Sequence, residues 1–286
     1  MNFSEKPIVF PCQEDSLIGI IAEPEHGAAT GLLLVVGGPQ YRVGSHRQFR
    51  LLSRTLADAG YPVMRFDFRG MGDSSGRLRD FEQVDEDIGA AIEAFCANCP
   101  SVERIVLWGL CDAASASLLY LDAINDARIS GLVLLNPWVR SEATQARARV
   151  KHYYRQRLFQ RDFWRKFLTG KMNVFQAIGG LVGNWNTSLR LGKKSIRQPV
   201  LCFQARMLSG LKKMQIPLLL ILSGKDYVAK EFLDVVQLEQ DWQMVLQRQN
   251  VKTVAIPEAD HTFSSAEWRA GVEQATQKWL NAVFKD

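Results

Sequence analysis

The chain has 286 residues, of which 47% are hydrophobic and 23% charged. This composition supports a buried core and excludes wholesale disorder. No apolar run approaches the roughly 20 residues of a membrane span, and residues 1–6 lack the basic and apolar regions of a secretory signal. We therefore expect a cytoplasmic protein whose five cysteines are free thiols.

Short apolar runs alternate with segments of helical spacing along most of the chain, which predicts alternating strands and helices. The predicted strands cover residues 7–11, 17–22, 31–36, 62–67, 104–109, 131–136, 216–222 and 253–256. The predicted helices cover residues 47–59, 81–97, 112–125, 230–247 and 266–284. Together they predict an α/β fold with a mostly parallel eight-stranded sheet, flanked by helices, whose first two strands form an antiparallel edge.

The alternation stops between residues 140 and 213, where 17 Lys and Arg residues stand against two acids. This segment, the basic insertion, has a charge of +15, so the rest of the chain carries −10 of the total +5. Its position after the sixth strand predicts a mainly helical cap above the carboxyl ends of the strands, where such sheets bind ligands. The core domain would then comprise residues 1–139 and 214–286.

The basic insertion interleaves its positive charges with aromatic side chains, and three interpretations fit that pattern. It would contact an anionic membrane surface, bind an acidic glycan or partner, or simply be solvated. No nucleic acid is expected, because the chain lacks a recognition motif for one.

The fifth strand ends in the pattern Gly109-Leu110-Cys111-Asp112-Ala113, and a predicted helix follows at once. A nucleophile at a sharp strand-to-helix turn needs small residues two positions before and after it. Gly109 and Ala113 satisfy that spacing, so we predict that Cys111 is a nucleophile that forms an acyl-cysteine intermediate. The alternative is an inert buried thiol, the commoner state of a cysteine taken alone.

An acid and then a base follow Cys111 in the chain order that such a site requires. Asp226 follows the seventh predicted strand, and His261 lies in the loop after the eighth. His261 would take the thiol proton, while Asp226 would fix the imidazole tautomer and stabilise its protonated form. Asp260 is the alternative acid. Asn136 fills the position after the sixth strand but supplies no charge.

The loop after the third predicted strand begins Gly37-Gly38-Pro39-Gln40. An oxyanion hole combines the backbone N–H of the residue after the nucleophile, here Asp112, with one from this loop. Because Pro39 has no N–H, Gln40 is the predicted second donor. A cluster of positive groups beyond the loop would pair with a substrate carboxylate or phosphate, or form a solvated helix start: Arg42, His46 and Arg47.

Two stretches of the sequence resemble those of a known protein family. They are Gly-Gly-Pro-Gln-Tyr-Arg-Val-Gly-Ser-His-Arg-Gln at residues 37–48 and Trp-Gly-Leu-Cys-Asp-Ala-Ala-Ser at residues 108–115. Together they resemble the type 1 hydrolases associated with exosortase A systems, within the α/β-hydrolase fold superfamily. The resemblance implies that fold, a hydrolase-type triad, and a cytoplasmic role beside exopolysaccharide synthesis and protein sorting in Gram-negative bacteria. The chain departs from the wider pattern at Cys111, usually serine, and at Gly-Gly-Pro, usually His-Gly. Members of this superfamily with a cysteine triad, such as dienelactone hydrolase, imply that cysteine in place of serine is compatible with catalysis.

These observations predict an acyl-transfer enzyme with a Cys-His-Asp triad that cleaves an ester, thioester or lactone of a small acyl substrate. We expect no metal or cofactor. Two alternatives stay open: transfer of the acyl group onto a sugar or another acceptor, and a non-catalytic binding module that uses the basic insertion. The pattern specifies neither the acyl chain length nor the oligomeric state.

Overall fold

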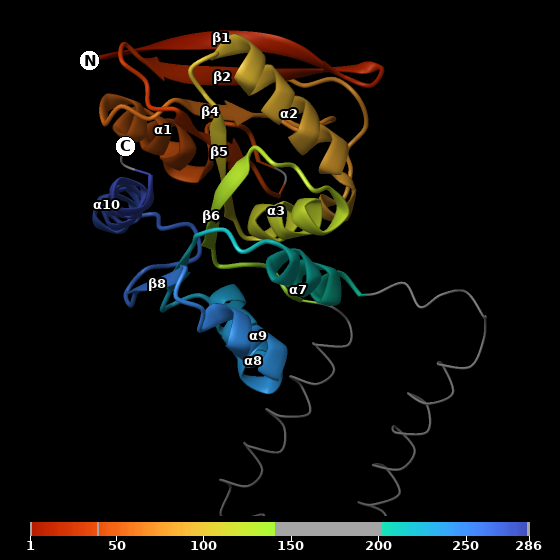
Figure 1. Cartoon of the computed structure of the whole chain (residues 1–286), viewed down its shortest axis with the longest axis vertical. Coiled ribbons are helices and arrows are strands. Elements are labelled where there is room, and N and C mark those ends of the chain that lie inside the picture. Colours follow the sequence, from red (N-terminus) through yellow and green to blue (C-terminus); the bar gives the residue numbers. More distant parts are fainter. Residues whose placement is uncertain (1, 39, 141–201, 285–286) are drawn as a thin grey trace, which may run out of the picture. The chain divides into compact units, whose positions relative to one another are not determined.

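The computed structural model describes residues 2–38, 40–140 and 202–284 (Figure 1). Eight strands of these residues form one sheet in the order β1-β2-β4-β3-β5-β6-β7-β8. β1 and β2 are antiparallel to each other and β2 is antiparallel to β4, whereas all other neighbours are parallel. The predicted sheet is therefore confirmed. The strands are β1 (Phe3–Cys12), β2 (Asp15–Pro24), β3 (Thr30–Val35), β4 (Val63–Phe66), β5 (Arg104–Leu110), β6 (Ile129–Leu135), β7 (Leu218–Ser223) and β8 (Val251–Ile256).

Helices cover both faces of the sheet (Figure 1). α1 (Gln48–Asp58) and α10 (Ala266–Val283) pack on one face, against side chains such as Leu32 and Leu34 of β3. The opposite face, which includes Leu33, is covered by α2 (Asp85–Asn98), α3 (Asp112–Ala123), α7 (Phe203–Lys213), α8 (Tyr227–Leu238) and α9 (Gln240–Leu246). Every residue of β3 is buried, as expected of an apolar strand between two helical layers.

The helix predicted over residues 230–247 is two helices in the structure. Glu239 adopts an extended conformation, with φ −120° and ψ 112°, and separates α8 from α9. The apolar spacing continues across this break, which is why the sequence pattern alone predicts one helix.

The compact core unit resumes at Cys202 rather than at residue 214, the boundary that the charge pattern suggested. The reason is the apolar face of α7, where Met207, Leu208 and Leu211 are buried. A side chain at Gly210 would lie 2.4 Å from a backbone oxygen of α3, so the two helices approach closely. Residues 141–201, and with them most of the predicted cap, lie outside the described residues. Within the described parts, no helix has the length and apolar character to cross a membrane.

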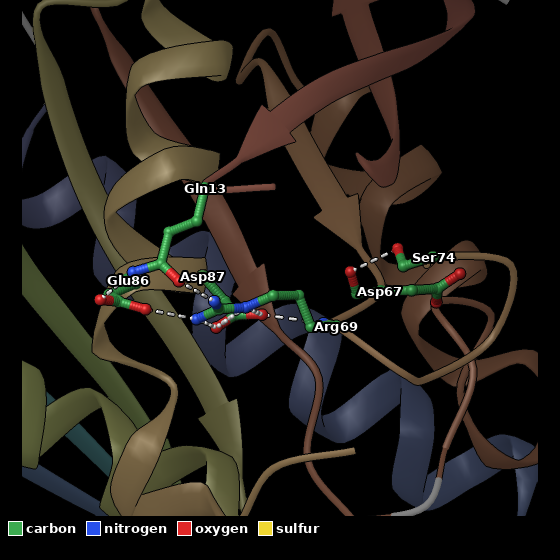
Figure 2. A network of polar contacts seen from close by, with 6 residues as sticks. All are labelled: Gln13, Asp67, Arg69, Ser74, Glu86 and Asp87. Carbon is green, nitrogen blue, oxygen red and sulfur yellow. Dashed lines mark hydrogen bonds and ion pairs between the residues drawn. The ribbon is translucent and has the colours of Figure 1, made fainter. Parts of the chain in front are cut away.

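A buried arginine ties the loop after β4 to the rest of the core (Figure 2). The Arg69 side chain is fully buried and forms an ion pair with Asp87 of α2, with 2.7 Å between Nη2 and Oδ2. It also donates to Gln13 and to Glu86. In the same loop, the Ser74 hydroxyl donates to the backbone oxygen of Asp67. The loop that carries Phe68 and Met71 is therefore held by charge-assisted hydrogen bonds.

Removing one partner of this buried pair should be costly. We expect Asp87→Ala to lower the free energy of unfolding by about 3–5 kcal/mol, because it leaves the Arg69 guanidinium buried without its carboxylate. Glu86→Ala removes a carboxylate whose side chain is 51% exposed, and should cost less than about 1 kcal/mol. Urea unfolding followed by circular dichroism measures both. Equal losses in the two variants would contradict this interpretation of the network.

Candidate active site

Cys111 lies at the turn between β5 and α3, in a backbone conformation that L-residues rarely adopt. Its φ is 62° and its ψ is −122°, a strained geometry of the kind that costs roughly 1–3 kcal/mol and occurs at functional sites. The surrounding core holds it there. The Cys111 N–H donates to the oxygen of Leu135 at 2.9 Å, and its carbonyl accepts from Trp138 at 3.2 Å.

Two glycines make this turn sterically feasible. A Cβ at Gly109 would lie 2.7 Å from the carbonyl carbon and oxygen of Ala113, and one at Gly37 would lie 2.7 Å from the Ala113 nitrogen. Both distances are shorter than real Cβ contacts, so larger residues would force the first turn of α3 away from the strand. The spacing seen in the sequence thus reflects close packing around Cys111.

Asp226 is both the N-cap of α8 and a partner of His261. Its carboxylate accepts from the N–H groups of Val228 and Ala229 at 3.1 and 3.2 Å. Its Oδ2 lies 2.8 Å from Nδ1 of His261. Burial pushes the pKa of Asp226 upward, but the hydrogen bond and charge of His261 and the two N–H donors outweigh it, so the pKa is below its ordinary value. Asp226 is therefore an ionised partner for the imidazole.

The His261 ring lies between the Asp226 carboxylate and the Cys111 sulfur. Its pKa is raised to about 10, first by the hydrogen bond to Asp226 and then by the one to Cys111, with burial acting in the opposite direction. The structure thus brings the three predicted triad residues together. Asp260, the alternative acid, is turned away and accepts hydrogen bonds from Thr262 and Ser264 of its own loop.

Asn136, which the sequence analysis set aside because it supplies no charge, has a structural role beside the site. The side chain is fully buried and joins three loops at the carboxyl ends of the strands. Its Nδ2 donates to Ser223 Oγ at 2.7 Å and to the His261 carbonyl oxygen at 3.2 Å, while Oδ1 accepts from the Ser223 N–H at 2.9 Å. Its φ of 42° is one that asparagine tolerates better than most residues. Asn136 therefore positions the loop that carries the histidine.

The Gln40 N–H, which the sequence predicts to be the second oxyanion donor, is engaged in its own loop. The Gln40 N–H donates to the Gly38 carbonyl oxygen at 2.7 Å, so it is not presented to the turn at Cys111. The Gly38 N–H, in contrast, lies 2.7 Å from Oδ2 of Asp112. The Ala113 N–H lies 3.0 Å from Oδ1 of the same carboxylate. Two backbone donors, one from the loop after β3 and one from the first turn of α3, thus converge on the Asp112 side chain.

The three positive candidates beyond the loop do not form one cluster. Arg42 is buried, and its guanidinium forms ion pairs with Asp67 and Asp73, which leaves its charge compensated inside the protein. His46 and Arg47 are exposed at the short helix η1 (Ser45–Arg47). Burial acts to raise the pKa of Asp260. The hydrogen bonds from Ser264 and Thr262 and, to a smaller extent, the charge of His46 outweigh burial, so this pKa is lowered. His46 therefore lies beside the loop that carries His261.

Among the described residues, no group of three or more His, Cys, Asp or Glu side chains is placed to hold a metal ion.

The sequence matches the alpha/beta hydrolase family over residues 26–274. Since this match covers most of the chain and the strand order and turn geometry are those described above, the chain belongs to the alpha/beta hydrolase family. No curated protein matches the sequence.

Solved structures show the same fold. The chain is similar to an esterase from Pyrococcus furiosus, with a TM-score of 0.65, 17% identity, and 99% of this chain and 94% of the other covered. It is also similar to a dienelactone hydrolase from Anabaena variabilis, with a TM-score of 0.62, 15% identity and 100% of both chains covered. A third similar structure is an acylaminoacyl peptidase from Pyrococcus horikoshii, with a TM-score of 0.63 and 18% identity. The match covers 100% of this chain and 42% of the other. At these identities the likeness shows the fold alone.

The raised pKa of His261 predicts a pH-dependent stability. Because the pKa moves from 6.5 to about 10 on folding, protonation of His261 stabilises the folded state fully below about pH 6.5, and this contribution is lost as the pH rises through about 10. Because the His261 side chain is 35% exposed, solvent screening reduces this contribution to the free energy of unfolding to about 1–2 kcal/mol. Urea unfolding from pH 6 to 10.5 should show this decline, and Asp226→Asn should flatten it. Equal slopes in both proteins would argue against the His261–Asp226 pair.

Asn136→Ala should lower the free energy of unfolding by about 2–3 kcal/mol, because it leaves the buried Ser223 N–H without an acceptor and places alanine at a positive φ. The matched control is Asn98→Ala, which removes one hydrogen bond at the end of α2 and should cost less than about 1 kcal/mol. Urea unfolding compares them. A loss in Asn136→Ala no larger than in the control would contradict the role in joining three loops.

Proposed function

We propose that the protein is a hydrolase that cleaves an ester, thioester or lactone through an acyl-cysteine intermediate. Cys111 is the nucleophile, His261 the general base and acid, and Asp226 the residue that orients the imidazole. The observation that carries the proposal is the His261 ring: its Nδ1 lies 2.8 Å from Oδ2 of Asp226, and Cys111 is close enough to raise its pKa. Membership of the alpha/beta hydrolase family supports a hydrolytic reaction.

The first half of the reaction forms the acyl-enzyme. His261 takes the thiol proton of Cys111, and the sulfur attacks the carbonyl carbon of the substrate. The carbonyl π electrons move onto oxygen, where the N–H groups of Gly38 and Asp112 would stabilise the negative charge once the Asp112 carboxylate no longer occupies them. When the tetrahedral intermediate collapses, the bond to the leaving group breaks and His261 returns the proton to the departing alkoxide or thiolate. The acyl group is then bonded to the Cys111 sulfur.

The second half releases the acid. His261 takes a proton from a water molecule whose oxygen attacks the acyl-cysteine carbonyl, and collapse of this second intermediate expels the Cys111 sulfur. Asp226 stays ionised throughout and stabilises the imidazolium, in keeping with its lowered pKa. An alcohol or sugar hydroxyl in place of water would give acyl transfer by the same steps.

The sequence adds a biological setting to this chemistry. The resemblance of residues 37–48 and 108–115 to exosortase-associated hydrolases supports a substrate made or used beside exopolysaccharide synthesis. Contact of the basic insertion with an anionic membrane or an acidic glycan stays a prediction of the sequence, because residues 141–201 lie outside the described residues.

An assay of acyl esters, acyl thioesters and lactones tests the proposal. Cys111→Ala and His261→Ala should each lower kcat/KM at least about a thousandfold, since each removes a group that takes part in bond making. Cys111→Ser should retain a small fraction of the activity, because a hydroxyl depends more heavily on the base. Mass spectrometry of the enzyme quenched during turnover should detect one acyl group on Cys111.

Cys202 provides the control. It is a free and exposed thiol at the N-cap of α7, so Cys202→Ala should leave turnover and the acyl adduct unchanged. Full activity in Cys111→Ala would refute the proposed nucleophile. Product analysis with an added alcohol separates the two acceptors: an ester product indicates transfer, and free acid alone indicates hydrolysis.

A further inference from the structure

The side chain of Asp112 accepts hydrogen bonds from backbone N–H groups beside the turn at Cys111, where the proposed reaction would form its oxyanion. Its Oδ2 lies 2.7 Å from the Gly38 nitrogen and its Oδ1 lies 3.0 Å from the Ala113 nitrogen. The backbone N–H of Asp112 also acts to lower the pKa of this carboxylate and so favours its charged form. The carboxylate thus collects N–H donors from the first turn of α3 and from the loop after β3, an arrangement that favours an anion.

The backbone around this carboxylate is shaped to accommodate it. A Cβ at Gly37 would lie 2.1 Å from Oδ1 of Asp112, so only glycine leaves room for the side chain at that point. Gly38 has a φ of 63°, a conformation that glycine adopts without strain. Among the described residues, no Lys or Arg forms an ion pair with Asp112. The backbone N–H groups are therefore its main compensation.

An apolar cavity of about 280 Å³ begins beside this carboxylate. Asp112 lines it together with side chains from the loop after β4, from the short helix η2 (Phe81–Gln83) and the residue that follows it, and from α3, with Arg79 and Asp80 also at its wall: Phe68, Met71, Phe81, Val84, Ala113 and Ala116. An engineered apolar cavity of about 150 Å³ is enough to hold a benzene ring. The cavity beside Asp112 is therefore large enough for a medium-length acyl chain, and it shares its wall with the predicted oxyanion position.

We propose that Asp112 is a specificity-determining residue, whose carboxylate occupies the oxyanion position until an apolar acyl chain enters the neighbouring cavity and displaces it. The inference rests on the proposed function. Two negative charges cannot share the N–H groups of Gly38 and Asp112, so the carboxylate must leave before the tetrahedral intermediate forms. A long acyl chain gains the free energy for this displacement from burial in the cavity, whereas an acetyl group gains little.

The test compares acetyl and octanoyl thioesters in the wild type, Asp112→Asn and Asp112→Ala. The wild type should prefer octanoyl by at least about tenfold in kcat/KM. Asp112→Asn keeps the shape of the side chain without the charge, and both variants should raise the acetyl rate at least about fivefold while changing the octanoyl rate less. Alkylation of Cys111 by iodoacetamide forms no oxyanion, so its rate should stay within about twofold. Asp58→Asn, at the exposed end of α1, is the control and should change none of these rates.

The outcomes separate this inference from the proposed function. Equal losses of acetyl and octanoyl turnover in a folded Asp112→Asn with normal alkylation would overturn the inference, since they would make Asp112 an ordinary contributor to turnover. A wild type without chain-length preference would also overturn it. The proposed function fails by a different result, the persistence of turnover in Cys111→Ala.

Discussion

The close contact between the end of β5 and the first turn of α3 is the constraint on which the rest of the site depends. It forces Cys111 into a conformation with positive φ, and it requires residues without side chains at Gly37 and Gly109. The core supplies the free energy that maintains this strain, because β5 is buried between two helical layers and its neighbours fix the turn by hydrogen bonds. The half-buried Cys111 is thereby held at the carboxyl ends of the strands, where the loops of several other strands converge.

The acid and base are organised by the same edge of the sheet. β7 ends just before Asp226, β8 ends before the His261 loop, and Asn136 follows β6. Since these strands are parallel neighbours, their carboxyl ends lie side by side, and three groups far apart in sequence meet there. Asn136 binds both Ser223 and the His261 backbone, so the histidine is fixed through its main chain, while Asp226 fixes its ring. The imidazole is thus held at two points before any substrate arrives.

The sequence predicts the fold well, and it selects three residues that the fold places at one edge of the sheet, because both depend on local signals. Alternating apolar runs reveal the strands, and the order Cys111, Asp226, His261 follows from the position of each after a strand. The role of Asn136, the burial of Arg42 and the choice of Gly38 over Gln40 were not predictable in this way. Each depends on which partner a side chain or N–H group meets across the fold: Ser223, Asp67 and Asp112 respectively. Charge patterning likewise assigned α7 to the basic insertion, although its apolar face packs on α3.

Charge at this site is balanced in a way that bears on selectivity. The Asp226 carboxylate raises the proton affinity of His261, which favours the imidazolium beside the Cys111 sulfur. A second carboxylate, that of Asp112, follows the nucleophile in the chain and has no ion-pair partner among the described residues, and burial raises its pKa even though backbone N–H groups oppose that rise. In the mechanism that we propose, one acid supports proton transfer, while the other competes for the N–H donors of the oxyanion. Since the apolar cavity begins at that second acid, an acyl chain bound there would supply binding energy where the competing charge has to be displaced.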